Sequence, residues 1–194
     1  MRCSTGTTSS MKIKVVGLDP SLRNWGVAVA TYDTEDGSLE VNELAVIRPC
    51  NKRGKVPMNV FDLGRAVHLA KYVGPYLVGA KKVMVELPVG SQSSRAMVNY
   101  GMCLGVMGAI YSASYELTVV TAREVKSIAT GDVCASKSQM IQWATAQHPE
   151  ANWPTRVVKG VPQVVAGEAE HMADALAAVY AGLAIATKTN ETIN

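Results

Sequence analysis

The chain has 194 residues, of which 48% are hydrophobic and 18% are charged, so it can form one folded domain and is not disordered throughout. Its net charge of +3 is too small to identify a nucleic-acid partner by itself. The four cysteines are widely spaced and form no CxxC pair, which argues against a disulfide framework and a zinc knuckle and favours reduced thiols in a cytoplasmic protein.

The first quarter of the chain is typical of an antiparallel meander. Residues 1–11 lack the apolar stretch of a signal peptide and are expected to form a flexible tail. Three β-rich runs joined by short turns follow, and strands are expected at residues 12–19, 26–32 and 39–47. The third strand leads into a basic loop, whose cationic residues are Arg48, Lys52, Arg53 and Lys55.

Strands and helices alternate in the rest of the chain. Val60, Leu63 and Val67 recur at steps of three and four, which is the spacing of one face of a helix. Helices are expected at residues 57–74, 93–115, 122–129, 136–147 and 168–187, with strands at 83–87 and 117–120. The proline-containing segment 148–167 is expected to be a loop.

This order of elements predicts an α/β domain over residues 12–187, followed by a flexible tail at 188–194. Its five-stranded mixed sheet would have three antiparallel strands and then βα units, with helices on both faces. We expect no membrane contact, because the longest charge-free apolar run, 175–187, is shorter than the ~20 residues that a membrane span needs.

Four polar residues occupy positions that suggest chemistry. Asp19 and Glu86 each end an apolar strand, where a carboxylate is costly unless it is paired, hydrogen-bonded or bound to a cation. Taken singly, each is explained as well by a strand-capping role. His171 and Asp174 are three residues apart and share one face of the last helix.

If these four groups converge, they form an oxygen-rich site suited to divalent cations. Mg²⁺ prefers carboxylates together with water and substrate phosphate. Two such ions about 4 Å apart can activate a water and stabilise the leaving oxygen in phosphodiester hydrolysis. Carboxylates alone would repel a phosphate backbone, so the acidic residues and the basic loop are compatible only if cations lie between protein and substrate.

Four blocks of sequence, in order, resemble the motifs of RuvC-type Holliday junction resolvases. The first is Gly-Leu-Asp-Pro at 17–20 with Trp-Gly-Val-Ala at 25–28, and the second is Val-Glu at 85–86. The third comprises residues 122–126, Gly131 and 135–139, and the fourth is the segment 171–177. Together they cover most of the chain.

The resemblance implies an RNase H-like fold and a homodimer that cuts four-way DNA junctions with two Mg²⁺ ions per site, for which Mn²⁺ can substitute. It implies metal ligation by Asp19, Glu86 and Asp174, with His171 either a ligand or a group that manages the attacking water. Lys126 and Lys137 match positions needed for activity, where they would face the scissile phosphates.

The sequence also departs from the family pattern. Val89 stands where some resolvases place an aromatic wedge at the junction. The segment 151–167 is longer than the corresponding family loop and the N-terminal tail is extra, which suggests a phage-encoded or otherwise atypical member.

Several alternatives remain. Actin-like ATPases and sugar kinases share the first-strand motif but need two such domains, roughly twice this length. A nuclease for RNA–DNA hybrids or other branched DNA, and a junction-binding protein without cleavage, stay open. The helix at 93–115 is expected to form the dimer interface or, equally well, to pack on the sheet. Arg95, near its start, and the basic loop are further candidate DNA contacts.

Overall fold

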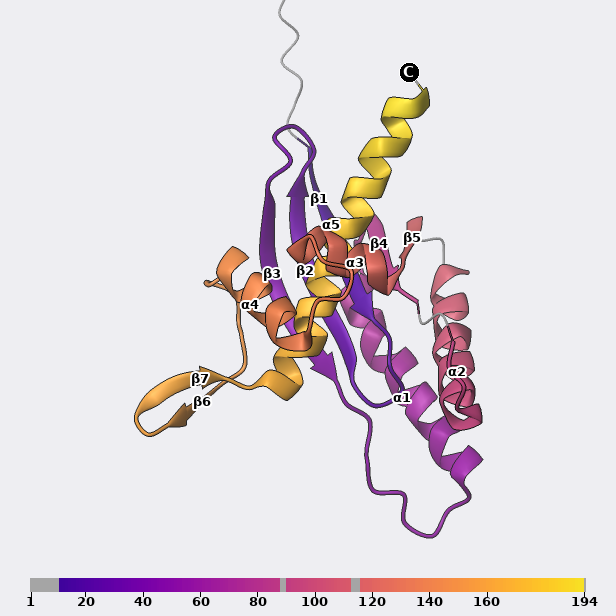
Figure 1. Ribbon diagram of the computed structural model, residues 1–194. Coiled ribbons are helices and arrows are strands. Elements are labelled where there is room, and N and C mark those ends of the chain that lie inside the picture. The colour runs from indigo at the N-terminus through magenta and orange to yellow at the C-terminus, as the bar shows by residue number, and fades with distance from the viewer. Residues whose placement is uncertain (1–10, 88–89, 113–115, 194) are drawn as a thin grey trace, which may run out of the picture.

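The computed structural model describes residues 11–87, 90–112 and 116–193, and it contains a mixed five-stranded sheet with the strand order β3-β2-β1-β4-β5 (Figure 1). The central strand β1 pairs antiparallel with β2 and parallel with β4. The strands are β1 (Lys12–Asp19), β2 (Trp25–Asp33), β3 (Leu39–Ile47), β4 (Lys82–Glu86) and β5 (Glu116–Val120). The predicted sheet is confirmed.

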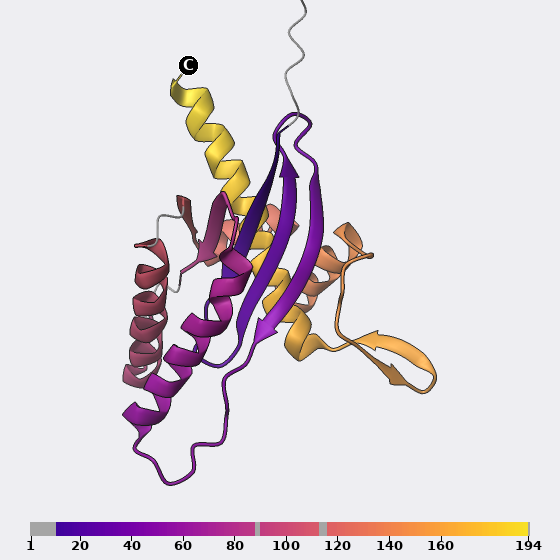
Figure 2. The ribbon, with the colours of Figure 1, turned by 180° about the vertical axis from the view of Figure 1, so that it is seen from behind.

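Helices cover both faces of the sheet (Figures 1 and 2). One layer consists of α1 (Met58–Leu77) and α2 (Ser94–Tyr111), and the other of α3 (Ala122–Thr130), α4 (Lys137–Gln147) and α5 (Ala166–Ile193). Successive side chains of a strand point to opposite faces. Accordingly Val15 packs in the core beneath α5, and Val16 packs in the core beneath α1 and α2.

Helix α5 lies very close to the sheet because two strand positions have no side chain. A Cβ on Gly17 would stand 2.0 Å from the carbonyl oxygen of Ala175. A Cβ on Gly26 would stand 2.0 Å from the carbonyl oxygen of His171. Since Gly26 pairs with Asp19 across β1 and β2, this contact places the start of α5 directly beside the end of β1.

The predicted loop at 148–167 is wrong, because part of it forms a hairpin that extends away from the body (Figure 1). Strands β6 (Thr155–Val158) and β7 (Val161–Val164) pair antiparallel around Lys159 and Gly160. Both turn residues have positive φ, of 50° and 79°, as a tight hairpin turn of type I′ requires. Pro162 is tolerated because a two-stranded ribbon has free edges.

The apolar stripe that predicted α1 faces solvent instead of the core. Val60, Leu63 and Val67 are 53%, 60% and 60% exposed. The opposite face is buried although it carries two charged residues, and its members are Asp62, Arg65, Leu69, Val73 and Leu77. The periodicity therefore identified the helix but not its inner face.

The C-terminal end of the chain also differs from expectation. α5 runs from Ala166 to Ile193, whereas the sequence placed this helix at 168–187 and a tail after it. The first ten residues of the predicted N-terminal tail lie outside the described residues. Among the described residues, no helix combines the length and the hydropathy of a membrane span.

Cys50, Cys103 and Cys134 are free thiols.

Candidate active site

The ends of two adjacent parallel strands bring Asp19 and Glu86 side by side. Leu18 of β1 is in register with Val85 of β4, so the next residue on each strand is the carboxylate. Neighbouring strands lie about 4.8 Å apart. Leu18 and Val85 both pack beneath α1 and α2. The alternation of a strand therefore directs both carboxylates to the other face, where α5 lies.

The first turns of α5 supply the other two predicted residues. Nδ1 of His171 lies 2.8 Å from Oδ2 of Asp19, and the two side chains are hydrogen-bonded. Burial lowers the pKa of His171, but the hydrogen bond and the charge of Asp19 more than offset this, so the pKa is raised overall. The predicted convergence of Asp19 with the histidine is therefore present in the structure.

Two carboxyl groups of this cluster, those of Glu86 and Asp174, hold protons unusually tightly. Burial, followed by the charges of Asp19 and Asp174, raises the pKa of Glu86 from 4.5 to about 8. Burial and the charge of Asp19 raise the pKa of Asp174 from 3.8 to about 7. These mutual effects show that the three carboxylates share one electrostatic environment in which negative charge is poorly compensated.

Their chemistry fits a divalent cation, although the side chains are not arranged as a finished coordination shell. Within the described part of the chain, no three His, Cys, Asp or Glu side chains are placed so that together they could hold a metal ion. Mg²⁺ is usually bound by one or two carboxylates with water and substrate phosphate completing its shell. A closely spaced carboxylate pair such as Asp19 and Glu86 meets that requirement.

The two predicted lysines lie near the cluster in different ways. Lys126 of α3 is half-buried, and its charge lowers the pKa of both Glu86 and Asp174 against the larger effects that raise them. Lys137, at the start of α4, is 77% exposed and pairs with Oε1 of Glu170 at 3.0 Å. Lys126 is therefore beside the carboxylates, and Lys137 is at the rim.

Glu170 is a site residue that the sequence analysis missed. Its Oε1 lies 3.0 Å from Nζ of Lys137 and 3.5 Å from Nε2 of His171, so it links the rim lysine to the histidine. As an acidic residue near the start of a helix, it is explained equally well from the sequence by favourable electrostatics at a helix N-terminus. Its position next to His171 in the chain was the available signal.

The other predicted DNA contacts do not form one surface of free cations. Arg48 pairs with Oε1 of Glu168 at 2.8 Å, and Arg95 pairs with the buried Asp62. Arg53 lines a separate cavity, whereas Lys52 and Lys55 are exposed on the loop between β3 and α1. Val89, the residue at the predicted wedge position, lies outside the described residues.

We expect the metal-free protein to lose stability as the pH rises from about 5 to 8.5. Between its unfolded pKa near 4.5 and its folded pKa of about 8, Glu86 binds more protons in the folded state, so the free energy of unfolding falls with pH. Asp174, with a folded pKa of about 7, acts in the same direction. The raised pKa of His171 does so above its unfolded value of 6.5.

Thermal unfolding midpoints measured in EDTA across this range test the expectation. The variant Glu86→Gln should show a flatter dependence, and Mg²⁺ should restore stability most at high pH, because a cation binds the deprotonated folded state. Stability that increases steadily with pH in EDTA would contradict the raised pKa values of Glu86 and Asp174.

Solved structures of junction resolvases have the same fold. RuvC of T. thermophilus in complex with Holliday junction substrate superposes with a TM-score of 0.64 and 18% identity, covering 92% of this chain and 96% of that one. The yeast mitochondrial Holliday junction resolvase Ydc2 gives a TM-score of 0.59 and 14% identity, covering 87% of this chain and 77% of that one. No protein-family model and no curated protein sequence matches the chain.

A second structure of Thermus thermophilus RuvC gives a TM-score of 0.62 at 18% identity, with 92% of this chain and 97% of that one covered. At these identities the likeness establishes the fold. The chain therefore has an RNase H-like α/β fold of the kind found in RuvC, as the motifs predicted.

Proposed function

We propose that the chain is a metal-dependent endonuclease that resolves four-way DNA junctions by paired phosphodiester hydrolysis. The observation that carries the proposal is the carboxylate pair Asp19 and Glu86 at the ends of β1 and β4, with His171 hydrogen-bonded to Asp19. The fold supports it, since RuvC, whose structure holds a Holliday junction substrate, superposes on 92% of the chain.

In this proposal Asp19, Glu86 and Asp174 hold two Mg²⁺ ions, for which Mn²⁺ substitutes. Bound cations polarise the scissile phosphate and make water a better nucleophile. In its neutral form His171 carries its proton on Nδ1, where it donates to Asp19, so Nε2 remains able to accept a proton from the attacking water. Asp19 thus also orients the imidazole.

The free thiols Cys50, Cys103 and Cys134 support a reducing, cytoplasmic location.

Lys126 and Lys137 provide positive charge next to the carboxylates, where phosphate oxygens would lie. Lys137 would exchange its contact with Glu170 for one with DNA.

Replacement of Lys126 by alanine should reduce junction cleavage about 10–100-fold while changing the thermal midpoint little. The expected loss corresponds to about one to three kcal/mol, the value of a hydrogen bond to a charged group. Single-turnover cleavage and a melting curve of the same preparation measure the two effects. A lower midpoint with unchanged cleavage would assign Lys126 a structural role.

The decisive experiment for the function compares four labelled substrates of matched sequence, with Mg²⁺ and with EDTA. The substrates are a four-way junction, a linear duplex, a flap and an RNA–DNA hybrid. Symmetrical nicks in the junction, dependent on Mg²⁺, support the proposal. Preferential cutting of the hybrid or the flap would favour the corresponding alternative, and tight junction binding without cleavage would identify a binding protein.

We propose that the exposed face of α2 forms the homodimer interface. Its inner face packs on the sheet through Cys103, Val106 and Met107. The outer face carries small and apolar residues. An added Cβ at any of its glycines would meet no atom beyond the neighbouring helix backbone within 4 Å, so nothing in the described structure covers this face there. These outer residues are Met97, Gly101, Leu104, Gly105, Gly108 and Tyr111. The two expectations for this helix, packing on the sheet and forming the dimer interface, are therefore compatible, because each concerns a different face.

Helix α1, which packs against α2 in the same layer, also carries an exposed apolar stripe. We expect Leu104→Glu to convert a dimer to a monomer and to replace paired nicks by single nicks, because the two sites of a two-fold dimer act on opposite strands. Light scattering gives the mass. Val157→Glu on the exposed hairpin is the matched control, and a monomeric wild-type protein would contradict the proposal.

A further inference from the structure

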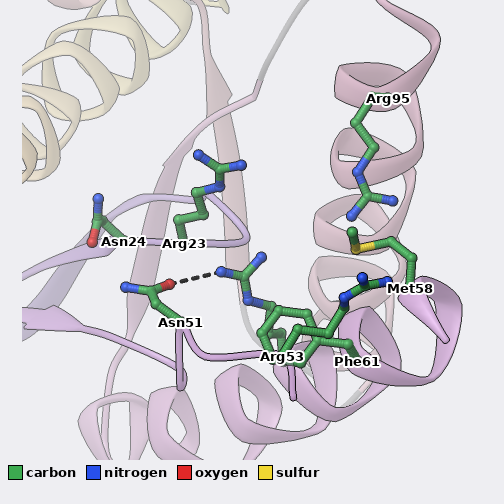
Figure 3. A pocket seen from close by; sticks show the side chains of 8 residues that line it. Arg23, Asn24, Asn51, Arg53, Met58, Phe61 and Arg95 are labelled. Carbon is green, nitrogen blue, oxygen red and sulfur yellow. Dashed lines mark hydrogen bonds between the residues drawn. The ribbon is translucent and has the colours of Figure 1, made fainter. Parts of the chain in front are cut away.

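A cavity of about 420 Å³ is lined by four arginines, one of which, Arg23, lies in the turn that follows Asp19 (Figure 3). Its walls come from the turn between β1 and β2, the loop before α1, the first turns of α1, and α2. Two asparagines and two apolar side chains complete the lining, which consists of Arg23, Asn24, Asn51, Arg53, Met58, Phe61, Arg65 and Arg95.

Arg65 is built rigidly into this cavity. It is only 7% exposed, and its guanidinium donates to Oδ1 of Asn51 at 2.7 Å and to the carbonyl oxygen of Cys50 at 3.4 Å. The guanidinium carbon also lies 4.6 Å from the centre of the Phe61 ring. A buried charge held on several sides is oriented before any ligand arrives.

The cavity has an excess of positive charge. Asp62 is fully buried and lies near two arginines. Its Oδ2 pairs with Arg95, and its Oδ1 lies 3.8 Å from a guanidinium nitrogen of Arg65. None of the lining residues is acidic. Among the described residues, no hydrogen bond or ion pair involves the side chains of Arg23 and Arg53. One carboxylate, which contacts two of the arginines, therefore opposes the charge of four guanidinium groups, and the remaining positive charge favours an anionic ligand.

We propose that this cavity, the arginine pocket, binds a phosphate group of a DNA strand at a point separate from the carboxylate cluster. Arginine presents donors in a planar fork that matches the oxygens of a phosphate, and the asparagine amides offer further donors. The volume exceeds what one phosphate needs and lies in the range of ligand sites. Met58 and Phe61 form an apolar wall for the attached sugar.

The location of the arginine pocket fits a strand that also reaches the carboxylates. Arg23 follows Asp19 by four residues, which span at most about 14 Å. A DNA strand carries one phosphate per about 3.4 Å of helix axis, so the pocket is within about four nucleotides of the phosphate at Asp19. The turn is anchored by Leu22 and Trp25, both of which are buried. This inference rests on the proposed function for its ligand.

The test measures junction binding in EDTA, so that no cleavage occurs, at several salt concentrations. The double variant Arg23→Gln/Arg53→Gln removes the two unpaired arginines and leaves Arg65 and its contacts intact. The matched control, Lys12→Gln/Lys81→Gln, removes the same charge from exposed positions at the opposite ends of β1 and β4. Melting curves verify that both variants fold.

We expect the pocket variant to bind the junction about tenfold more weakly, with the slope of log K against log salt reduced by about 1, as loss of one phosphate contact predicts. The control should keep the wild-type slope. An equal effect of both variants, or no effect of either, would overturn the proposal, as would a wild-type protein that binds no DNA.

A second arm separates a DNA phosphate from a free one. Inorganic phosphate and a nucleoside 5′-monophosphate are titrated calorimetrically into the wild-type protein. Saturable heat with the mononucleotide, together with an unchanged salt slope in the pocket variant, would assign the site to free nucleotides and overturn the DNA assignment. If the wild type cleaves junctions but the pocket variant keeps the wild-type salt slope, the proposed function holds and the pocket is rejected. If the pocket variant has a reduced salt slope but the wild type does not cleave, the pocket holds and the proposed cleavage is rejected.

Discussion

Asp19→Asn should abolish junction cleavage, by about a thousandfold or more, while junction affinity in EDTA stays within about threefold of the wild type. Asparagine keeps the shape of the side chain but removes the charge on which a cation depends, and metal ions supply several kcal/mol of transition-state stabilisation. Asp19 also accepts the hydrogen bond that orients His171. Single-turnover cleavage in Mg²⁺ and a gel-shift titration measure the two quantities.

Glu35→Gln is the matched control, because this exposed carboxylate lies in the turn between β2 and β3. It should cut junctions at the wild-type rate. The charge of Asp19 contributes to the raised pKa values of Glu86 and Asp174, so Asp19→Asn should also shift both toward their ordinary values. Near-normal cleavage by Asp19→Asn would show that Asp19 is not a metal ligand.

Gly26→Ala should be one of the most damaging small substitutions in the fold, because it clashes next to the candidate active site. The added Cβ would stand 2.0 Å from the carbonyl oxygen and 2.7 Å from the carbonyl carbon of His171, and these backbone atoms cannot rotate away. The start of α5 or strand β2 must therefore shift. We expect a loss of about 1–3 kcal/mol in the free energy of unfolding, as in other overpacked interiors.

Cleavage by Gly26→Ala should fall further than the loss of folded protein explains, because the shift moves His171 away from Asp19. Urea unfolding gives the stability, and cleavage is compared at a temperature where the variant is fully folded. Gly64→Ala on α1 is the control, since a Cβ there meets nothing within 4 Å and alanine favours a helix. Equal stability and activity of the two variants would contradict the packing argument.

Much of the candidate site could be predicted because its residues lie within short, self-contained patterns. An apolar run ending in a carboxylate identified Asp19 and Glu86, and helical spacing placed His171 and Asp174 on one face. The bounds of β1 and β3 agree with the predicted 12–19 and 39–47. Each of these patterns depends on neighbours no more than a few residues away, and such signals are readable along a single chain.

The inner face of α1 and the arginine pocket could not be predicted in this way. Val60 and Leu63 look like core residues, but Asp62 and Arg65 are buried because Arg95 of α2 and Asn51 of the preceding loop supply their partners. The pocket joins arginines from four separate segments. The sequence marked the basic loop and Arg95 as candidate DNA contacts, but nothing in it indicated that they meet Arg23 and Arg65. The hairpin at 155–164 was missed because the segment 148–167 contains three prolines, which are typical of a loop.

Local periodicity and the motif blocks predicted most of the element types and the mixed sheet, and they singled out the four candidate site residues. Their convergence depended on long-range contacts: the parallel register of β1 with β4, and the close approach of α5 at Gly17 and Gly26. The register of the strands and the distance of α5 from the sheet result from packing between segments that are far apart in the chain. The free energy of that packing belongs to pairs of segments, so neither segment reveals it alone.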